Sequence, residues 1–262
     1  MREIRHSRRG LIKGALASLG GLGLAGCDGG ADNPIVQKLF ALEEMLTFRT
    51  QSALLGPDAL AKEYTEADIS TFFKPNGSKD PQDESYKALA ADGFKDYKLV
   101  VDGLVERPAQ YSLAELRAMP SRTQITRHDC VEGWSCIGKW SGVRLSHVLD
   151  AVGVKPAARY VVFHCADTPG EAAFGEDAPD HFYGSIDFQA ARHDQTILAY
   201  DFNGAPLGIP HGAPLRVRVE RQLGYKMSKY IMRIELVESF AHIGGGHGGY
   251  WEDNGYTWYA GV

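Results

Sequence analysis

The stretch Arg127-His128-Asp129-Cys130-Val131-Glu132-Gly133-Trp134-Ser135 decides how the rest of this chain is interpreted. It is polar, it has aromatic flanks, and it precedes a stretch that we expect to be helical. Spacing alone leaves two explanations for its central residue, Cys130. The residue is either structural, in a disulfide with Cys136 or Cys165 or as a buried inert thiol, or it is a free thiolate with a chemical role.

The first 27 residues have the pattern of an export signal and not of a folded segment. Ser7-Arg8-Arg9-Gly10-Leu11-Ile12-Lys13 is typical of a twin-arginine signal. The apolar run at 16–25 is shorter than the about 20 residues that a membrane-spanning helix needs. Leu24-Ala25-Gly26-Cys27 is typical of a bacterial lipobox, so we expect cleavage before Cys27 and its lipidation. The alternative is a short basic N-terminal anchor that is never cleaved.

These signals predict where the protein works. The twin-arginine route exports proteins that have already folded, often with a cofactor inserted. Two or more acyl chains on Cys27 would hold the protein stably at a membrane. We therefore expect a lipid-anchored protein in the periplasm or on the outer face of the cytoplasmic membrane. The other three cysteines are an odd number, so at least one is expected to be free or used.

The net charge bears on the class of partner. The chain has 28 Lys and Arg against 33 Asp and Glu, a formal charge of −5. Residues 1–27 contain five basic residues and one acidic residue, so the mature chain carries −5 − 4 = −9. An acidic protein does not favour a nucleic-acid partner.

The mature chain is expected to form one domain with short extensions at both ends. Residues 28–34 read as a tether, 35–241 as the domain and 242–262 as a tail rich in glycine and aromatic residues. Apolar residues at helical spacing over 35–50 predict a helix that packs on the domain or, alternatively, docks a membrane partner. The tail has five Trp or Tyr side chains after residues 244–249, so we expect it to fold back over the body, across a pocket.

Within the domain, short helices mix with many strands. Ser112-Leu-Ala-Glu115 is a capping box that opens one helix, and 145–152 is a second helix that Gly153 ends. Asn203-Gly204 is a hairpin signal. Strands are expected at 98–101, 160–165, 197–200, 215–219 and 230–236, and clean alternation predicts that the fourth is half-buried. The pattern indicates an α+β fold with mixed or antiparallel sheets and short helices.

Four motifs, through their order and spacing along the chain, resemble the sulfite oxidase superfamily. They are the segment 127–140 around Cys130, His211-Gly-Ala-Pro-Leu-Arg216, Gly224-Tyr-Lys-Met-Ser-Lys-Tyr230 and the weaker Asp102-Gly-Leu-Val-Glu-Arg-Pro108. Cys-Val-Glu-x-Trp is closest to the branch of periplasmic methionine-sulfoxide reductases, whereas sulfite oxidases proper show Cys-small-Gly-Asn. The resemblance implies a sulfite-oxidase-type molybdopterin-binding fold over most of the mature domain.

By this resemblance Cys130 donates its thiolate to molybdenum beside the dithiolene of one molybdopterin per chain. A soft thiolate suits a redox metal that handles an oxo group. The implied cofactor-binding residues are Asn76, Cys165, His211, Arg216, Met227, Ser228 and Lys229. Guanidinium and ammonium groups are suited to a phosphate. Considered singly, His211 would be a turn histidine, and Arg216 and Lys229 a solvated strand face.

The neighbours of the cysteine are candidates for catalysis. Glu132 would tune the metal or relay a proton, with Trp134 beside it, and a surface carboxylate is the alternative. Arg127 and His128 would lend positive charge to an oxyanion substrate. The catalytic candidates are therefore Cys130, Glu132, Arg127 and Trp134.

The predicted function is two-electron oxo transfer by a molybdenum oxidoreductase on a small sulfur- or nitrogen-oxo substrate, as in sulfoxide reduction. A sulfite-oxidising enzyme of the same fold is the alternative. The sequence has no Cys-x-x-Cys-His for haem attachment, so electrons are expected to pass through a separate membrane haem protein or cytochrome. Other classes are a zinc site at His164, His242 and His247, and a membrane-anchored binding lipoprotein without catalysis.

Overall fold

The computed structural model describes residues 34–56, 58–168 and 181–262. The chain divides into two units, Met1–Arg49 and Thr50–Val262, and each is considered by itself. The export signal, the lipobox with Cys27 and the tether up to residue 33 lie outside the described residues.

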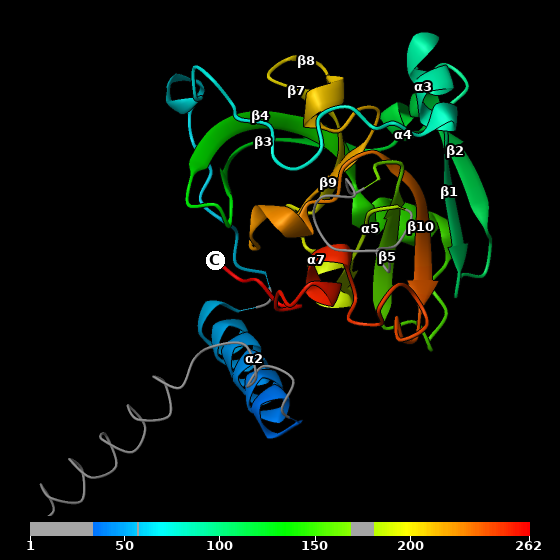
Figure 1. Ribbon diagram of the computed structural model, residues 1–262. Helices are drawn as coiled ribbons and strands as arrows, with labels where there is room; N and C mark the ends of the chain where they lie inside the picture. Colours follow the sequence, from blue (N-terminus) through cyan, green and yellow to red (C-terminus); the bar gives the residue numbers. More distant parts are fainter. Residues whose placement is uncertain (1–33, 57, 169–180) are drawn as a thin grey trace, which may run out of the picture. The chain divides into compact units, whose positions relative to one another are not determined.

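The described part of the first unit is helical. Helix α2 runs from Pro34 to Leu55 (Figure 1), which confirms the helix expected from the apolar spacing. Its packing on the domain stays a prediction. Several of its apolar side chains are exposed, namely Ile35, Leu39, Phe40, Leu42, Met45 and Leu46. Among the described residues no helix has both the length and the apolar character to cross a membrane.

The second unit contains two five-stranded sheets. One has the order β2-β1-β10-β5-β6. Its strands are β1 Lys98–Gly103, β2 Ala109–Ser112, β5 Tyr160–Cys165, β6 Tyr183–Asp187 and β10 Ile231–Val237. Only the β1–β10 pair is parallel, with Val101 opposite Ile234. The sheet is therefore mixed.

The other sheet has the order β3-β4-β7-β8, and β9 also pairs with β7. Its strands are β3 Ser121–Asp129, β4 Ser135–Arg144, β7 Ile197–Phe202, β8 Ala205–Pro206 and β9 Arg216–Arg218. All of its pairs are antiparallel. Figure 1 shows the long green β3–β4 hairpin curving away from the sheet that contains β1, β5 and β10.

Short helices connect these strands. They are α3 Glu84–Ala91, α4 Leu113–Ala118, α5 Leu145–Val152, α6 Phe188–Arg192 and α7 Tyr250–Asp253, with 3₁₀ turns η1 Glu66–Asp68, η2 Ile209–His211 and η3 Gly224–Lys226. The Ser112–Glu115 capping box opens α4 as expected. Gly153 ends α5 at φ 69°, a conformation that glycine adopts without strain. The α+β prediction is confirmed.

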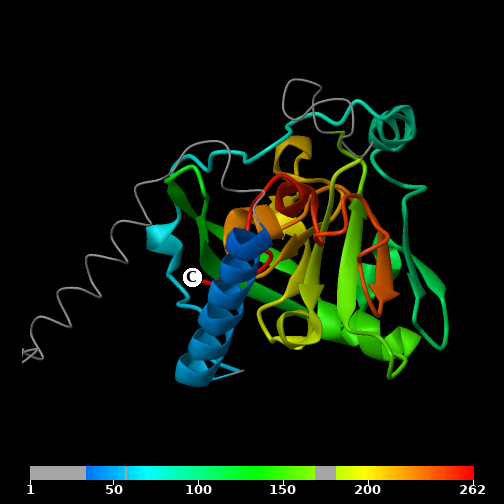
Figure 2. The ribbon, with the colours of Figure 1, turned by 60° about the horizontal axis from the view of Figure 1, so that its bottom comes forward.

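The main core is formed by the two sheets and α5. Leu99, Phe163, Leu198, Val217 and Ile234, from five different strands, are fully buried in one cluster with the apolar face of α5. Each such side chain contributes about 1.5–3 kcal/mol through burial. Figure 2 shows two of these strands, the light green β5 and the orange β10, side by side.

Two local predictions were wrong. The stretch after the cysteine segment is strand β4, paired with β3 from Ser135 to Val143, and helix α5 begins only at Leu145. Strand β9 alternates as expected but is buried on both faces. Val217 packs in the main core, while Arg216 and Arg218 lie 4.9 and 4.5 Å from the ring centre of Trp140. Alternation in sequence predicts two faces, and it does not say whether one of them meets water.

Candidate active site

The cysteine lies in the tight turn that joins β3 to β4. The backbone N–H of Cys130 donates to the carbonyl of Trp134 at 2.9 Å, and Gly133 donates back to the carbonyl of Cys130 at 3.0 Å. Gly133 has φ 83°, which glycine tolerates in such a turn. Cys130, Cys136 and Cys165 are all free thiols, so the disulfide alternative is wrong. Burial raises the pKa of the Cys130 thiol, against an opposing hydrogen bond from the backbone of Glu132. A bound metal would reverse this and favour the thiolate.

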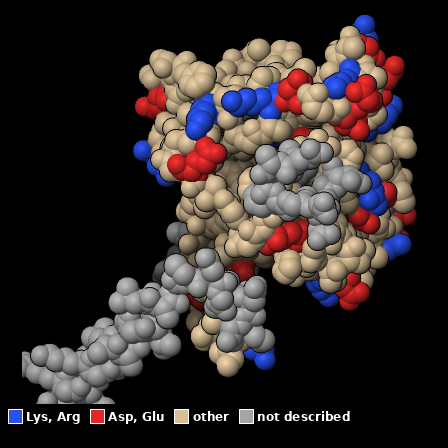
Figure 3. Space-filling view, viewed as in Figure 1, with Lys and Arg blue, Asp and Glu red and all other residues tan. Residues whose placement is uncertain are grey.

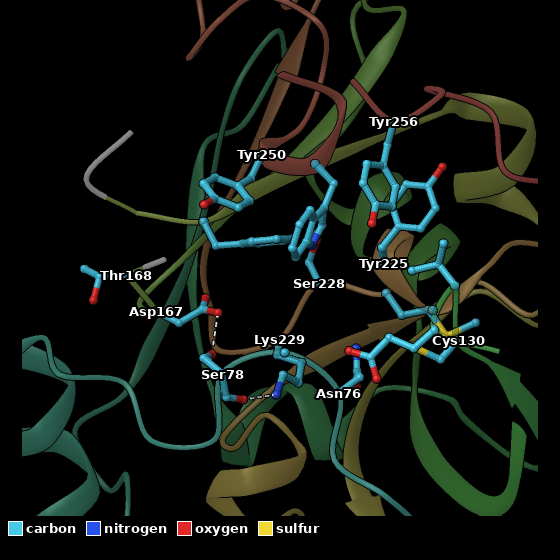
Figure 4. A pocket seen from close by; sticks show the side chains of 17 residues that line it. Asn76, Ser78, Cys130, Asp167, Thr168, Tyr225, Ser228, Lys229, Tyr250 and Tyr256 are labelled. Carbon is cyan, nitrogen blue, oxygen red and sulfur yellow. Dashed lines mark hydrogen bonds between the residues drawn. The ribbon is translucent and has the colours of Figure 1, made fainter. Parts of the chain in front are cut away.

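A cavity of about 310 Å³ opens beside this thiol. Five segments line it: the loop 76–78, the turn 130–132, residues 167–168 with Phe182, the segment 224–229, and the tail. Figure 4 shows Cys130 and Lys229 from separate elements facing the same space. The cavity has the size of a cofactor or small-ligand site.

Arg216 is fully buried and does not line the cavity. One guanidinium nitrogen donates to the carbonyl of His211 at 3.0 Å, another lies 3.4 Å from the carbonyl of Met227, and Nε has no partner in the described structure. Burial lowers the pKa of Arg216 to about 9, and the neighbouring charge of Arg218 adds to the effect. The solvated alternative for this residue is therefore wrong.

Lys229 lines the cavity and is 5% exposed. Its ammonium donates to the carbonyls of Ser78 and, at 3.2 Å, of Pro210. Burial lowers the pKa of Lys229 to about 7, with a further contribution from Arg216. A bound anion would raise this lowered pKa, because an opposite charge favours the protonated form of the amine.

The turn after η2 brings the two cations together. Gly212 has φ 108°, and a side chain there would approach Lys229 to 2.9 Å and Arg216 to 3.3 Å. The ring centre of the preceding His211 lies 4.7 Å from that of Phe202, with the two rings tilted at 47° to each other. Burial, followed by the charges of Arg216 and Lys229, lowers the pKa of His211 to about 4, so its ring is neutral at pH 7. The turn is thus close-packed and needs glycine.

These groups fit an anionic cofactor with hydrogen-bonding edges. Asn76 Oδ1, His211 Nδ1 and Arg216 Nε are buried, and each lacks a hydrogen-bond partner in the described part of the chain. Buried cations and unpaired polar atoms cost several kcal/mol unless a ligand satisfies them. A phosphate would pair with the cations, and a polar heterocycle would meet the remaining groups. The chemistry of this set therefore suits a molybdopterin.

The predicted site residues fall into two groups. Asn76, Cys130, Glu132, Met227, Ser228 and Lys229 line the cavity. Cys165, His211, Arg216, Arg127 and Trp134 do not line it. Cys165 ends β5 as a buried thiol. Burial raises the pKa of this thiol, whereas Ser228 and Lys229 act to lower it. It thus lies close to the cofactor-binding segment without reaching the cavity.

The predicted neighbours of Cys130 occupy different environments. Glu132 accepts from Trp134 Nε1 at 2.8 Å and from Lys74 at 3.1 Å, and these two bonds lower its pKa. It is therefore an ionised carboxylate that lines the cavity and is also exposed at the surface. Arg127 forms an exposed ion pair with Asp129 at 2.9 Å, so its guanidinium is not presented to the cavity.

His128 is fully buried on β3. Its Nδ1 lies 2.9 Å from a guanidinium nitrogen of Arg218, which acts as donor. Burial and then Arg218 lower the pKa of His128 well below its usual range. The ring is neutral, and the expectation that it lends positive charge to a substrate is wrong.

Sequence reasoning missed several lining residues. The hydroxyl of Ser78 donates a hydrogen bond to the carboxylate of Asp167 at 2.7 Å, and both residues line the cavity. Burial raises the pKa of Asp167. No motif marks them, because one is in a loop and the other follows a strand end. The tail contributes Tyr250, Trp251 and Tyr256, which confirms that it folds back across a pocket.

Two of the three histidines considered for zinc, His164 and His247, have carboxylate partners. His164 lies 2.9 Å from Glu235, and His247 lies 3.2 Å from Asp253. Among the described residues no group of three His, Cys, Asp or Glu is placed to hold a metal ion.

The face drawn in Figure 3 carries charges of both signs on its described part. In Figure 3 the Lys and Arg side chains are interspersed with Asp and Glu on the described part of this face. A nucleic-acid-binding face would gather its basic residues in a patch or stripe.

Comparison with known proteins agrees with this chemistry. The family model described as oxidoreductase molybdopterin binding domain matches residues 87–242. A protein of Azospira oryzae, provisionally named protein-methionine-sulfoxide reductase subunit YedZ1, is 37% identical over 97% of this chain and 88% of its own length. The protein-methionine-sulfoxide reductase catalytic subunit MsrP of Xanthomonas axonopodis pv. citri is 30% identical over 90% of this chain and 71% of its own.

Among solved structures, the sulfane dehydrogenase SoxCD from Paracoccus pantotrophus is similar at 23% identity and a TM-score of 0.47. The match covers 55% of this chain and 39% of that chain, and it is too distant to support an inference. The family match and the identity along almost the whole chain carry the assignment. This chain therefore belongs to the family of oxidoreductases with a molybdopterin-binding domain.

Proposed function

We propose that this molybdenum–molybdopterin oxidoreductase reduces sulfoxides at the cavity beside Cys130, and that Cys130 is a ligand of the molybdenum. The observation that carries the proposal is a free thiol on the same cavity as the buried cation Lys229. A guanidinium nitrogen of the buried Arg216 lies 3.4 Å from the carbonyl of Met227, which also lines this cavity. The relatives named protein-methionine-sulfoxide reductase support reduction of a sulfoxide.

The cofactor supplies the two-electron redox change and the position that accepts an oxo group. The chain supplies binding and orientation. Arg216 and Lys229 would hold the phosphate, and the β3–β4 turn would present the thiolate of Cys130 from a rigid hairpin. Burial excludes water from these cations, which strengthens their attraction for an anion.

Reduction of a sulfoxide consumes two protons and two electrons and yields a thioether and water. Glu132 is suited to relay protons from solvent, because its carboxylate borders the cavity and is exposed to water. Lys74 and Trp134 hold the carboxylate in place, at 3.1 and 2.8 Å. An external electron donor completes the balance, and a membrane haem protein or a cytochrome is the class that we propose.

The sulfite-oxidising alternative runs in the opposite direction, with water as the oxygen source. The names of the relatives favour reduction of a sulfoxide over this alternative. We also propose that the enzyme is exported by the twin-arginine route and held by lipid on Cys27, as the sequence predicts.

The test uses the purified holoenzyme, its metal content and a panel of sulfoxides, N-oxides and sulfite with a reduced viologen dye or an oxidising dye. We expect about one molybdenum per chain and sulfoxide reduction. Cys130→Ala should lower kcat/KM by at least about a hundredfold, whereas the matched Cys136→Ala should retain activity. Sulfite oxidation as the dominant activity, or full activity of Cys130→Ala, would refute the proposal.

A further inference from the structure

The C-terminal tail lies beyond the family match, which ends at residue 242. It is nevertheless part of the domain. Gly249 forms a β-bridge with Gly184 of β6, and Gly261 forms one with Gln222 just before η3. The tail therefore runs from the edge of one sheet to the segment that precedes the cofactor-binding residues 227–229.

A buried ion pair fixes the middle of the tail. Lys226 of η3 donates to Glu252 of α7, and both side chains are almost fully buried. The ammonium of Lys226 also lies 5.3 Å from the ring centre of Trp258. Residue 226 directly precedes the cofactor-binding residues, so the position of α7 is tied to theirs.

Further hydrogen bonds hold both sides of α7. The carboxylate of Asp253 accepts from the backbone of Gly245 at 2.8 Å, the backbone of His247 at 3.0 Å and the hydroxyl of Tyr183. Trp258 Nε1 donates to Ser185 at 2.9 Å. The glycine-rich stretch thus wraps the carboxylate, and the aromatic residues after it are held in fixed positions.

Three tail rings form one wall of the cavity. Tyr250, Trp251 and Tyr256 all line it, and Trp251 lies 5.4 and 5.2 Å from the ring centres of the other two. Figure 4 shows Tyr250 and Tyr256 along one side of the cavity, with Asn76, Ser78 and Lys229 along the other. The polar groups and the aromatic rings therefore face each other across the space beside the thiol.

We propose that Trp251 and Tyr256 are specificity-determining residues that bind the apolar substituent of the oxo substrate. The inference rests on the proposed sulfoxide reduction. Aromatic faces bind alkyl, aryl and sulfur groups through dispersion and contacts between sulfur and the ring. The opposite side is polar and is needed for the cofactor. A substrate that carries one oxo group and one bulky apolar group would gain most from this wall.

The test compares two sulfoxides with the holoenzyme. Methyl phenyl sulfoxide has an aromatic substituent, and dimethyl sulfoxide has only methyl groups. In Trp251→Ala and Tyr256→Ala we expect the ratio of kcat/KM for the larger over the smaller substrate to fall about tenfold. Tyr259→Ala removes a ring of the same tail that does not line the cavity, so its ratio should stay that of the wild type.

A second readout does not require turnover. Methyl phenyl sulfone has the same apolar group and is not a sulfoxide, and its binding can be measured by calorimetry on each variant. We expect weaker binding in Trp251→Ala and Tyr256→Ala by about tenfold, with unchanged binding in Tyr259→Ala. Molybdenum content measured in parallel identifies a variant that has lost its cofactor. In that event the milder variant at the same position, Trp251→Phe or Tyr256→Leu, is measured instead. It should show a smaller fall in the kcat/KM ratio and in the sulfone affinity.

The outcomes separate the inference from the proposed function. If the wild type reduces both sulfoxides and the ratio and the sulfone affinity are the same in all variants, the tail does not determine specificity. If the wild type reduces neither sulfoxide, the proposed function fails. Sulfone binding that still depends on Trp251 and Tyr256 would then show that the wall binds apolar groups for another reaction.

Discussion

The charged residues of the site have unusual environments for their types. Arg and Lys side chains normally point to water, yet Arg216 in strand β9 is fully buried, and Lys229, between η3 and β10, is nearly so. Each is held by backbone carbonyls, which satisfy hydrogen bonds and leave the positive charge in place. Their charge is thus kept available for an anion, at a cost to the stability of the cofactor-free protein.

Lys229 should make the stability of the cofactor-free protein depend on pH. Its pKa is about 7 in the folded chain and 10.5 ordinarily. Between these values the unfolded chain binds more protons, so stability rises with pH across about pH 7–10. We expect a contribution of up to about 1.4 kcal/mol per pH unit. Urea unfolding of protein made without cofactor, at pH 7, 8 and 9, measures it.

Lys229→Met is the control for that slope. It removes the ammonium and keeps an apolar chain of similar length, and all other titrating groups remain. We expect a flatter dependence in the variant, and also in the wild type with bound cofactor, because an anion restores the ordinary pKa. Equal slopes in wild type and variant would rule out Lys229 as the source.

The site residues could be predicted where they belong to motifs that follow each other in the order known for the family. Cys130 and the cations were found through three motifs in sequence, and the cavity brings Cys130, Ser228 and Lys229 together. The prediction that Arg127 faces the site was wrong. In a hairpin, the side chains of residues two or three positions from a ligand can point to either face of the sheet. Asp167 carries no local signal at all, because its position depends on a strand end and a loop from elsewhere in the chain.

At the scale of elements, the turn η3 has to approach β3 very closely. A Cβ on Gly224 would lie 2.3 Å from Nε2 of His128, whose ring is buried and held by Arg218. Since that ring has no room to yield, Gly224→Ala should cost about 1–3 kcal/mol and displace the residues that bind the cofactor. A lower urea midpoint of unfolding, together with less molybdenum per chain, would show this.

Gly208→Ala is the matched control, because a Cβ there meets its nearest atom only at 3.9 Å. Its backbone is extended, so alanine is accommodated without strain. We expect a change within about 0.5 kcal/mol and normal molybdenum content. Similar effects of the two substitutions would mean that the close approach of η3 to β3 is not what limits the site.

One buried ion pair, Lys226 with Glu252, contributes to the attachment of the tail. Glu252→Gln leaves the ammonium of Lys226 buried beside a neutral amide, and loss of one partner of such a pair costs about 3–5 kcal/mol. We expect a lower urea midpoint and faster proteolysis within residues 242–262. The double variant Lys226→Met, Glu252→Leu should lose less stability than Glu252→Gln alone. Unchanged proteolysis of the tail in Glu252→Gln would contradict this account of its attachment.

Some elements were predictable from sequence and others were not. The strands 160–165, 197–200 and 230–236 were found because alternating or continuous apolar runs mark them. Strand β4 was missed, since Gly138 and Gly142 weaken its strand pattern. Gly142 is needed there because a Cβ would approach the backbone of Leu198 to 2.1 Å. The parallel pairing of β1 with β10 has no local signature, because the two strands are distant in sequence.

At the scale of the whole molecule, attachment at Cys27 would keep the catalytic unit near its electron donor. The seven residues from Cys27 to the start of α2 at Pro34 span at most about 25 Å, even if fully extended. Two or more acyl chains give stable membrane binding, which one chain alone does not. Electron transfer from a membrane haem protein would then need no diffusion of the enzyme through the periplasm.

Cys27→Ser should release the enzyme from the membrane without changing its chemistry. We expect the wild type in the membrane fraction, extracted only by detergent, and Cys27→Ser in the soluble periplasmic fraction. Molybdenum content and viologen-driven kcat/KM should be equal in the two, because the described residues that line the cavity come from positions 76–256. The pair Arg8→Lys, Arg9→Lys should prevent export and leave an uncleaved precursor inside the cell. If Cys27→Ser stays in the membrane fraction like the wild type, a basic N-terminal anchor that is never cleaved would explain the attachment, and lipidation would not.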